Sequence, residues 1–160
     1  MQKKCAVLFS FGEGGHTAQM NRLAPKIVES LKEFEIVSLS DTAIIPEWSD
    51  FHYKTSEVRG KHSHFSIFIN SGPILVVKSI VNINIKHNIK CMVTTGPGIG
   101  IFSAVICKLF GAKVIHIETW SRFNSRSLTG RCMYLIADEF YIQNKSLHSL
   151  YPKAIYSGIL

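Results

Sequence analysis

Strand and helix signals alternate along the whole chain, and this alternation limits the fold more than any other feature. Short apolar runs typical of buried strands occur at 5–10, 35–39, 90–95, 113–117 and 139–143, with a shorter one near 52–55. Apolar residues recur every three or four positions in between, which predicts helices through 20–31, 71–86, 102–109 and 127–137. Strands that alternate with helices form a mostly parallel sheet covered on both faces. The pattern therefore predicts an α/β fold with a Rossmann-like, doubly wound sheet.

The length of 160 residues fits a single domain spanning 1–160, with a core large enough to be stable without disulfides or a metal. Hydrophobic residues make up 46% of the chain and charged residues 18%, which excludes a disordered or collagen-like protein. Lys and Arg number 18 against 11 Asp and Glu, so the formal net charge is +7. This charge indicates an anionic partner such as a phosphate group or a membrane surface. No nucleic-acid-binding module is recognisable, and we expect no nucleic-acid partner.

The cysteines and the apolar runs indicate where the protein works. Cys5, Cys91, Cys107 and Cys132 lie far apart without Cys-x-x-Cys spacing, so neither a zinc site nor a disulfide framework is expected. The apolar run after the first lysines is too short for a signal peptide, and no uncharged apolar stretch reaches the ~18 residues of a membrane span. These features predict a cytoplasmic protein with reduced thiols.

Charge is distributed unevenly along the sequence. No carboxylate occurs between Glu57 and Glu118, whereas seven basic residues fall there, namely Arg59, Lys61, Lys78, Lys86, Lys90, Lys108 and Lys113. Such a split indicates that one part of the surface faces anions. The alternative is that these side chains are solvated on several helix faces, and the sequence leaves the two interpretations balanced.

Two glycine-rich loops each follow an expected strand and precede an expected helix, at Gly12–Gly15 and at Gly96–Gly100. Glycine lets backbone N–H groups approach a phosphate closely, and a helix N-terminus adds positive partial charge. A tight strand-to-helix turn also favours glycine, but two such loops in one small domain favour phosphate binding. The dinucleotide fingerprint fails at Thr17, and Asp41 lies too far along to be its usual ribose-binding acid, so an NAD(P)-binding oxidoreductase is disfavoured.

His16 and Glu13 are the polar side chains of the first loop. A lone histidine is more often structural than catalytic, but His16 stands where the loop becomes a helix, and the helix dipole there opposes protonation. A neutral imidazole is able to act as a base near pH 7. A bound phosphate would instead favour protonation, and the sequence does not give the sign of the net effect. Glu13 would repel phosphate, so it either points away, or it takes a proton from a sugar hydroxyl or hydrogen-bonds to one.

Glu118 ends the expected strand 113–117, where ligands bind in open α/β sheets. The alternatives are that it caps the following loop or pairs with Arg122. His62 with His64, and His116 with Glu118, have the spacing of metal pairs, but neither pair has the remaining ligands, so no metal site is expected.

Four segments of this chain, in the same order along the sequence, resemble the Alg-fourteen/PssD family of glycosyltransferase subunits. They are FGEGGHTAQM (11–20), TGPG (95–98), ETWSRFNSRSLTGR (118–131) and ADEFYIQ (137–143). The first resembles the family's Gly-Ser-Gly-Gly-His-Thr-x-x-Met start, and the third resembles its Glu-Ser-x-x-Arg to Ser-Leu-Thr-Gly-Lys stretch. The matches span nearly the whole chain.

The resemblance implies half an enzyme: the N-terminal, acceptor-side domain of a GT-B glycosyltransferase similar to MurG. A separate partner of the Alg-thirteen/PssE type would bind the UDP-sugar donor. The implied reaction is an inverting, metal-free transfer of GlcNAc or another hexose to a polyprenyl-diphosphate-linked sugar, with no cofactor, in capsule, exopolysaccharide or oligosaccharide assembly. The length supports this, because a GT-B enzyme needs two such domains.

The resemblance also implies roles for particular residues. His16 is expected to be the general base on the acceptor hydroxyl, worth about 10²–10⁴ in rate, and Glu118 to orient the acceptor or the base. The acceptor diphosphate would be held by two glycine loops and their polar neighbours, namely Gly12, Glu13, Gly14, Gly15, Thr17, Gly96, Gly98, Gly100, Arg122 and Arg126. Glu13 stands where the family usually has a small residue.

A membrane-contacting stretch is expected at 59–86, in which basic residues alternate with apolar ones. It contains His64, Phe65, Ile67, Phe68 and Ile69, and it would hold the protein on an anionic membrane at the cytoplasmic face. A second hypothesis follows from this stretch. The chain would be a non-catalytic subunit that only recruits its partner to the membrane.

Overall fold

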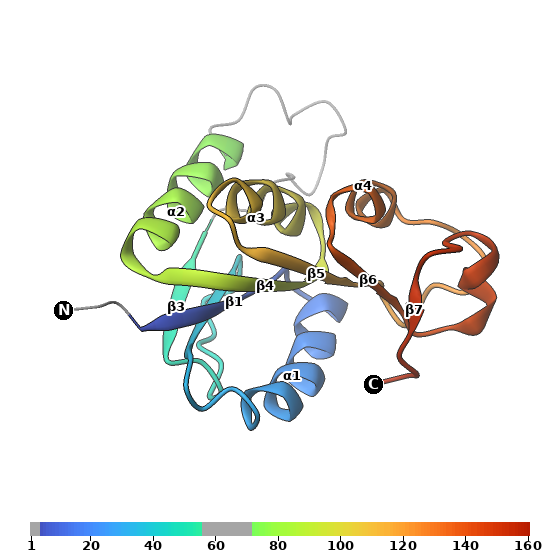
Figure 1. Cartoon of the computed structure of the whole chain (residues 1–160), viewed down its shortest axis with the longest axis horizontal. Helices are drawn as coiled ribbons and strands as arrows, with labels where there is room; N and C mark the ends of the chain where they lie inside the picture. The colour runs from blue at the N-terminus through green and yellow to red at the C-terminus, as the bar shows by residue number, and fades with distance from the viewer. Residues whose placement is uncertain (1–3, 56–71) are drawn as a thin grey trace.

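The computed structural model describes residues 4–55 and 72–160, which form one α/β unit (Figure 1). Their seven strands form one sheet in the order β3-β2-β1-β4-β5-β6-β7, and every neighbouring pair is parallel. The strands are β1 (Cys5–Phe11), β2 (Glu35–Ser40), β3 (Phe51–Lys54), β4 (Asn88–Gly96), β5 (Lys113–Ile117), β6 (Glu139–Ile142) and β7 (Ile155–Tyr156). The predicted α/β class and doubly wound sheet are confirmed.

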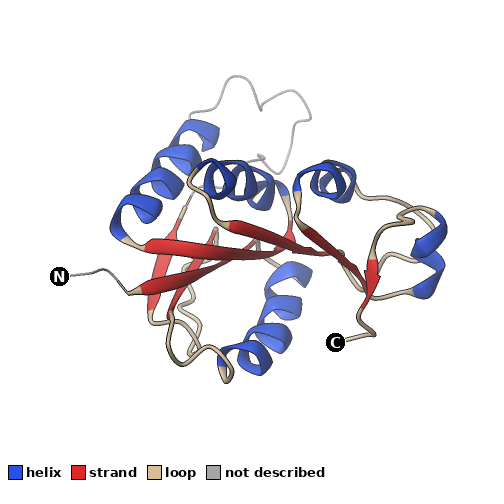
Figure 2. Cartoon of the chain, viewed as in Figure 1, coloured by secondary structure: helices blue, strands red, loops and turns tan. Residues whose placement is uncertain are grey.

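Helices cover both faces of the sheet (Figure 2). They are α1 (Gly15–Val28), α2 (Gly72–Lys86), α3 (Gly98–Leu109) and α4 (Leu128–Ile136), with a 3₁₀ helix, η2, at Lys145–Ser149. Helix α1 lies against one face, and α2, α3 and α4 lie against the other (Figure 1). The central strand β1 is buried almost throughout, which is why it stands in the sequence as a continuous apolar run.

Two apolar cores follow from the alternation of side chains along the strands. On the α1 side, Phe9 and Phe11 of β1 pack with Met20 of α1. On the other side, Leu8 of β1 and Met92 of β4 pack with residues of α2, α3 and α4. The sheet therefore separates two apolar cores, and loops lie at the carboxyl ends of its strands.

The strand order places two distant loops next to each other. From β1 the chain proceeds outward to β2 and β3, and then returns to β4 on the other side of β1. Open α/β sheets bind ligands at such a reversal, outside the carboxyl ends of the strands. Here the reversal brings the loop after β1 beside the loop after β4, although they are more than eighty residues apart in the sequence.

The structure corrects the predicted end of the sheet. The sequence predicts 139–143 as the last strand, but β7 follows it, and η2 lies between the two. Strand β7 has two residues, both exposed, so no buried apolar run in the sequence predicts it. Near 52–55 the predicted short strand is confirmed as β3.

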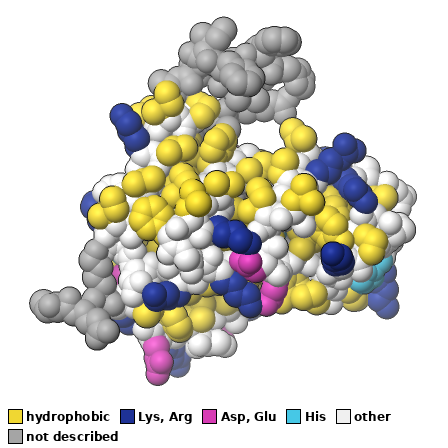
Figure 3. Space-filling model, turned by 45° about the horizontal axis from the view of Figure 1, so that its top comes forward, with side chains coloured by type: hydrophobic (Ala, Val, Ile, Leu, Met, Phe, Trp, Pro, Cys, Tyr) yellow, Lys and Arg dark blue, Asp and Glu magenta, His cyan; other side chains and the backbone are white. Residues whose placement is uncertain are grey.

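The outer surface of α2, α3 and α4 is unusually apolar. None of these helices contains an acidic residue, and their exposed side chains include large hydrophobic ones, which gather on this side of the molecule in Figure 3. We call this surface the apolar helix face; its exposed members are Ile74, Leu75, Ile85, Val105, Leu109, Leu128 and Leu135. Among residues 4–55 and 72–160, no helix has both the length and the hydropathy needed to cross a bilayer. The predicted membrane stretch 59–86 lies partly outside the described residues, including His64 to Ile69.

Candidate functional site

The two glycine loops contact each other at the carboxyl edge of the sheet. The N–H of Gly12 donates to the carbonyl of Gly96 at 3.2 Å. A Cβ on Gly12 would lie well inside 3.0 Å of the Pro97 ring, so only glycine allows this approach. The Gly12 N–H is already used in this contact, so Gly12 shapes the junction, and its role toward a phosphate stays a prediction.

Two other site glycines also have packing roles. Gly100 is buried, and a Cβ there would lie well inside 3.0 Å of the Thr94 hydroxyl, so glycine lets α3 pack on β4. Gly96 is buried with φ +89°, and its N–H donates to the Thr94 hydroxyl at 3.0 Å. Direct contact with a ligand, as the resemblance implies for both, is not expected from this burial. Thr17 likewise serves its own loop, since its hydroxyl donates to the Gly12 carbonyl at 2.7 Å.

The N-termini of α1 and α3 are open where the loops meet. Gly14 precedes α1 with φ 71°, Pro97 precedes α3, and neither position has a side-chain cap. Gly14 and Gly15 are exposed, and no atom lies within 4 Å of a Cβ built on either. Uncapped N–H groups with the positive end of a helix dipole attract an anion. Gly14, Gly15 and the half-buried Gly98 are therefore the backbone groups best placed to bind phosphate.

His16 is held at the junction by the second loop. Its Nδ1 lies 2.7 Å from the carbonyl oxygen of Thr95, and the Thr95 hydroxyl donates back to the His16 carbonyl. A carbonyl only accepts, so Nδ1 carries the proton and Nε2 of the neutral ring is the nitrogen with a lone pair. Burial lowers the pKa of His16 below 6.5, although the Thr95 bond and the charges of Glu118 and Asp41 oppose this. The imidazole is therefore neutral near pH 7, as required of a base.

Glu118 is buried, with 2% of its surface exposed, directly after β5. Its carboxylate accepts hydrogen bonds from the Thr119 N–H at 3.0 Å, the Ser127 hydroxyl at 3.2 Å and the Tyr151 hydroxyl at 3.1 Å. Ser127 is the N-cap of α4 and accepts from the Gly130 N–H at 2.7 Å. Of the readings from the sequence, capping of the following loop and helix describes this geometry best. The catalytic role remains a prediction.

The two loop arginines differ in their contacts. Arg122 donates to the Ser125 hydroxyl at 3.2 Å within the same loop. The exposed Arg126 donates to the Leu150 carbonyl, and its guanidinium carbon lies 5.2 Å from the centre of the Tyr151 ring. Arg122 is therefore the better candidate for binding an anion, and Arg126 fastens the loop to the C-terminal segment. Glu13 is exposed on the first loop, and its contact with the acceptor also stays a prediction.

The histidine pairs do not develop into a metal site in the part of the chain that is described. His116 is 1% exposed, packs against Phe140 at 5.0 Å between ring centres, and has its pKa lowered by burial to about 3. Within residues 4–55 and 72–160, no three His, Cys, Asp or Glu side chains gather as metal ligands. His62 and His64 lie outside those ranges.

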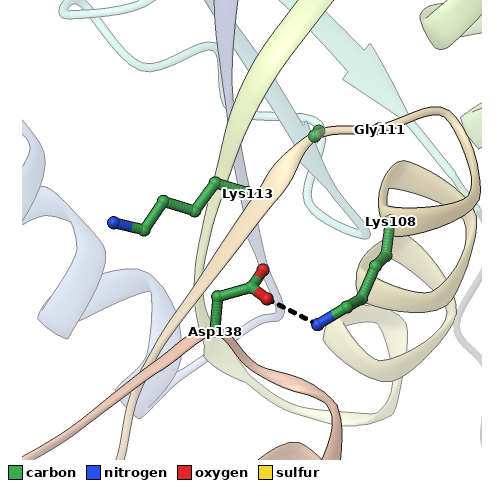
Figure 4. A pocket seen from close by; sticks show the side chains of 5 residues that line it. Lys108, Gly111, Lys113 and Asp138 are labelled. Carbon is green, nitrogen blue, oxygen red and sulfur yellow. Dashed lines mark hydrogen bonds and ion pairs between the residues drawn. The ribbon is translucent and has the colours of Figure 1, made fainter.

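A shallow hollow of about 480 Å³ lies away from these loops, near the amino end of β5. Figure 4 shows Lys108 and Asp138 pointing toward one another there, with 2.6 Å between Nζ and Oδ1. Lys113 beside them pairs with Glu139 at 2.5 Å. The charged groups of the hollow neutralise each other, and the hollow has no share in the glycine-loop junction.

Comparison with known proteins gives the chain's family. The family described as "Oligosaccharide biosynthesis protein Alg14 like" matches residues 7–160. The chain belongs to this family. Two relatives carry the name "UDP-N-acetylglucosamine transferase subunit ALG14". The Kluyveromyces lactis protein is 31% identical over 98% of this chain and 79% of its own length. The Candida albicans protein is 28% identical over 99% of this chain and 79% of its own length. A human protein of the same name is 20% identical over 98% of this chain and 83% of its own.

Solved structures agree with the family on the fold. MurG of Acinetobacter baumannii superposes with a TM-score of 0.63 over 89% of this chain, at 13% identity. A glycosyltransferase from Rickettsia africae superposes with a TM-score of 0.67 over 99% of this chain, also at 13% identity. The chain covers only 42% and 43% of these two proteins, so this Alg14-like chain corresponds to less than half of either.

Proposed function

We propose that this chain is the acceptor-side subunit of a glycosyltransferase. It would transfer GlcNAc or another hexose from a UDP-sugar to a polyprenyl-diphosphate-linked sugar, together with a donor-binding partner of the Alg-thirteen/PssE type. The names of its family relatives as UDP-N-acetylglucosamine transferase subunits support the reaction class. The need for a partner is supported by the names of the same relatives, because each of them is called a subunit.

The observation that carries this proposal is the contact of His16, in the first turn of the uncapped helix α1, with Thr95 at the end of β4, just before the uncapped helix α3. The diphosphate of the lipid would accept hydrogen bonds from backbone N–H groups of Gly14, Gly15 and Gly98. That would hold the linked sugar near the Nε2 of His16, whose Nδ1 is fixed by Thr95. A binding site and a base would then be built from the same two loops.

The chemistry follows from the protonation state of His16. Its Nε2 takes the proton of the acceptor hydroxyl as that oxygen forms a bond to the anomeric carbon of the donor. The bond from that carbon to the UDP oxygen breaks, and UDP leaves with the electron pair. Attack from the side opposite UDP inverts the anomeric configuration.

The apolar helix face supports a peripheral position on the cytoplasmic side of an anionic membrane. It has exposed leucines on the same helices as the exposed Lys78 and Arg131, and its helices contribute no carboxylate. Apolar side chains entering the bilayer and cations near its headgroups both favour binding. This face also favours the second candidate function, a subunit that only recruits its partner to the membrane.

Reconstitution tests the proposal and separates the two candidates. The purified chain is combined with a donor-binding companion, UDP-GlcNAc and a short polyprenyl-diphosphate-linked GlcNAc, and transfer is measured by chromatography. We expect no transfer by the chain alone, transfer by the pair, and loss of transfer in His16→Ala. Full activity of the chain alone would overturn the two-subunit proposal. A pair that keeps its full rate with His16→Ala would instead favour the recruiting subunit.

A further inference from the structure

The loop at 119–127, between β5 and α4, has no helix or strand of its own. Backbone carbonyls in such a segment need hydrogen-bond partners from elsewhere, because a buried polar group without one is costly. The loop also lies beside α1, since the guanidinium carbon of Arg22 is 5.0 Å from the centre of the Trp120 ring. The shape of this loop therefore decides where the Arg122 side chain is held.

Partners for three carbonyls of this loop come from one segment, Gln143–Tyr151, which follows β6. Its side chains contact the loop or the residue before it at successive points. Gln143 Nε2 donates to the Glu118 carbonyl at 2.9 Å, and the Tyr151 hydroxyl donates to Glu118 Oε2 at 3.1 Å. Asn144 Nδ2 donates to the carbonyls of Trp120 at 2.8 Å and Arg122 at 2.6 Å. Ser146 Oγ donates to the Phe123 carbonyl at 2.6 Å. The segment thus follows the loop over most of its length.

Asn144 makes the contact that is hardest to replace. Both of its partners are carbonyl oxygens, so only an NH₂ group, with its two hydrogens, can satisfy them together. The side chain is buried, with 8% of its surface exposed. One of the two carbonyls belongs to Arg122, so Asn144 fixes the backbone from which that guanidinium extends.

Tyr151 fixes the ends of the same loop through Glu118. The carboxylate of Glu118 accepts from the N–H of Thr119, at the start of the loop, and from the hydroxyl of Ser127, at its end. The fully buried Tyr151 donates to that carboxylate. A fixed carboxylate therefore holds both ends of the loop together.

We propose that Gln143–Tyr151 positions the 119–127 loop for acceptor binding, with Asn144 and Tyr151 as its positioning residues. The ligand that the loop receives, a lipid-linked diphosphate, rests on the proposed function above. Neither residue belongs to a motif that the sequence singles out. Their hydrogen-bond partners lie 22 to 33 residues away along the chain, so no local sequence pattern indicates these contacts.

The experiment has two arms, and both compare Asn144→Ala and Tyr151→Phe with Ser149→Ala. Ser149 is the matched control because it lies in the same segment but bonds only to the Ser146 carbonyl. In the first arm, hydrogen exchange is measured on the whole chain. We expect the amides of Thr119 and Arg122 to exchange about tenfold faster in Asn144→Ala, with unchanged exchange in β1 and β4. Unchanged exchange in the loop would overturn the proposal.

The second arm measures transfer by the chain with its donor-binding partner. We expect the KM for the lipid-linked acceptor to rise about tenfold in Asn144→Ala and less in Tyr151→Phe, with kcat and the donor KM unchanged. An unchanged acceptor KM would overturn the positioning role. If the loop exchanges faster in the variant but the unmodified pair transfers no sugar, the loop contacts stand and the proposed function fails.

Discussion

Helices α1 and α4 begin at the same edge of the sheet, but their N-termini are completed in different ways. Helix α1 starts after Gly14 with no side-chain cap, and its first residues are exposed. The N-terminus of α4 is capped by Ser127, and the buried carboxylate of Glu118 lies against that cap. The α4 end thus contacts a carboxylate of its own chain, whereas the first turn of α1 has no acidic residue, and we propose that an external anion binds there.

The difference separates stability from binding. A carboxylate near a helix N-terminus stabilises it by about 0.3–1 kcal/mol, and by up to ~2 kcal/mol when partly buried. Helix α1 lacks this contribution and has glycines in its place, which keeps its N–H groups accessible. We therefore expect substitutions at the α1 end to change catalysis and those at the α4 end to change folding.

His16→Ala gives the largest expected effect at the open end. Removing the base should lower kcat of the reconstituted pair by about 10²–10⁴. The free energy of unfolding should fall by only about 1 kcal/mol, the worth of one hydrogen bond. Steady-state kinetics and urea denaturation measure the two. A large loss of stability with a normal kcat would reverse the assignment of the two helix ends.

Gly130→Ala tests the capped N-terminus of α4. A Cβ there would lie within 3.0 Å of Glu118 Oε2, the Tyr151 hydroxyl and Ser127 Oγ, which are packed together. Such overpacking costs about 1–3 kcal/mol, and chemical denaturation should show a loss near the upper value. Gly15→Ala is the control, because its Cβ would meet no atom within 4 Å and its stability should be unchanged or slightly raised. Equal losses in both variants would contradict the contrast.

Leu135→Glu tests whether the apolar helix face contacts membrane. Leu135 is 86% exposed, and a glutamate there places a negative charge on a face whose helices have none. Binding to phosphatidylglycerol vesicles should weaken about tenfold, since a buried leucine contributes ~1.5–3 kcal/mol. Ser30→Glu adds the same charge next to α1 and should bind normally. Equal binding of the two variants, or binding that is insensitive to salt, would count against membrane contact.

The pH dependence is the subtlest expected effect and links the two ends. Burial lowers the pKa of His16 below 6.5, so the base is unprotonated at neutral pH, and kcat/KM should fall only as the pH drops through that lowered value. The charge of Glu118 raises the pKa of His16, so Glu118→Gln should move the acid limb to still lower pH. A limb that moves to higher pH would mean that the two side chains are not coupled in this way.

The fold and the site are predictable from the sequence where the signal is local. The glycine loops, His16 and the six longer strands follow from apolar runs and punctuation by glycine, and the structure places them at one edge as the parallel topology requires. The close packing of a glycine against a distant side chain is not predictable from the sequence. Gly12 and Gly100 look like ligand-binding glycines, but the proline and threonine side chains that explain them come from β4 and its loop.

The contacts of Glu118 show the same limit from the other direction. Its position after a strand was predictable, whereas its partners Ser127 and Tyr151 depend on how α4 and the C-terminal segment fold back. Strand β7 and η2 were missed for a related reason. They are short and mostly exposed, and tertiary contacts rather than an apolar repeat stabilise them.

The most direct test of the acceptor site is an NMR titration of the isolated chain with two probes, farnesyl diphosphate and UDP-GlcNAc. We predict that farnesyl diphosphate shifts the amide signals of Gly14, Gly15 and Gly98, while UDP-GlcNAc at the same concentration leaves them in place. Shifts caused by UDP-GlcNAc and not by the lipid diphosphate would contradict the claim that these two open helix ends form an acceptor site.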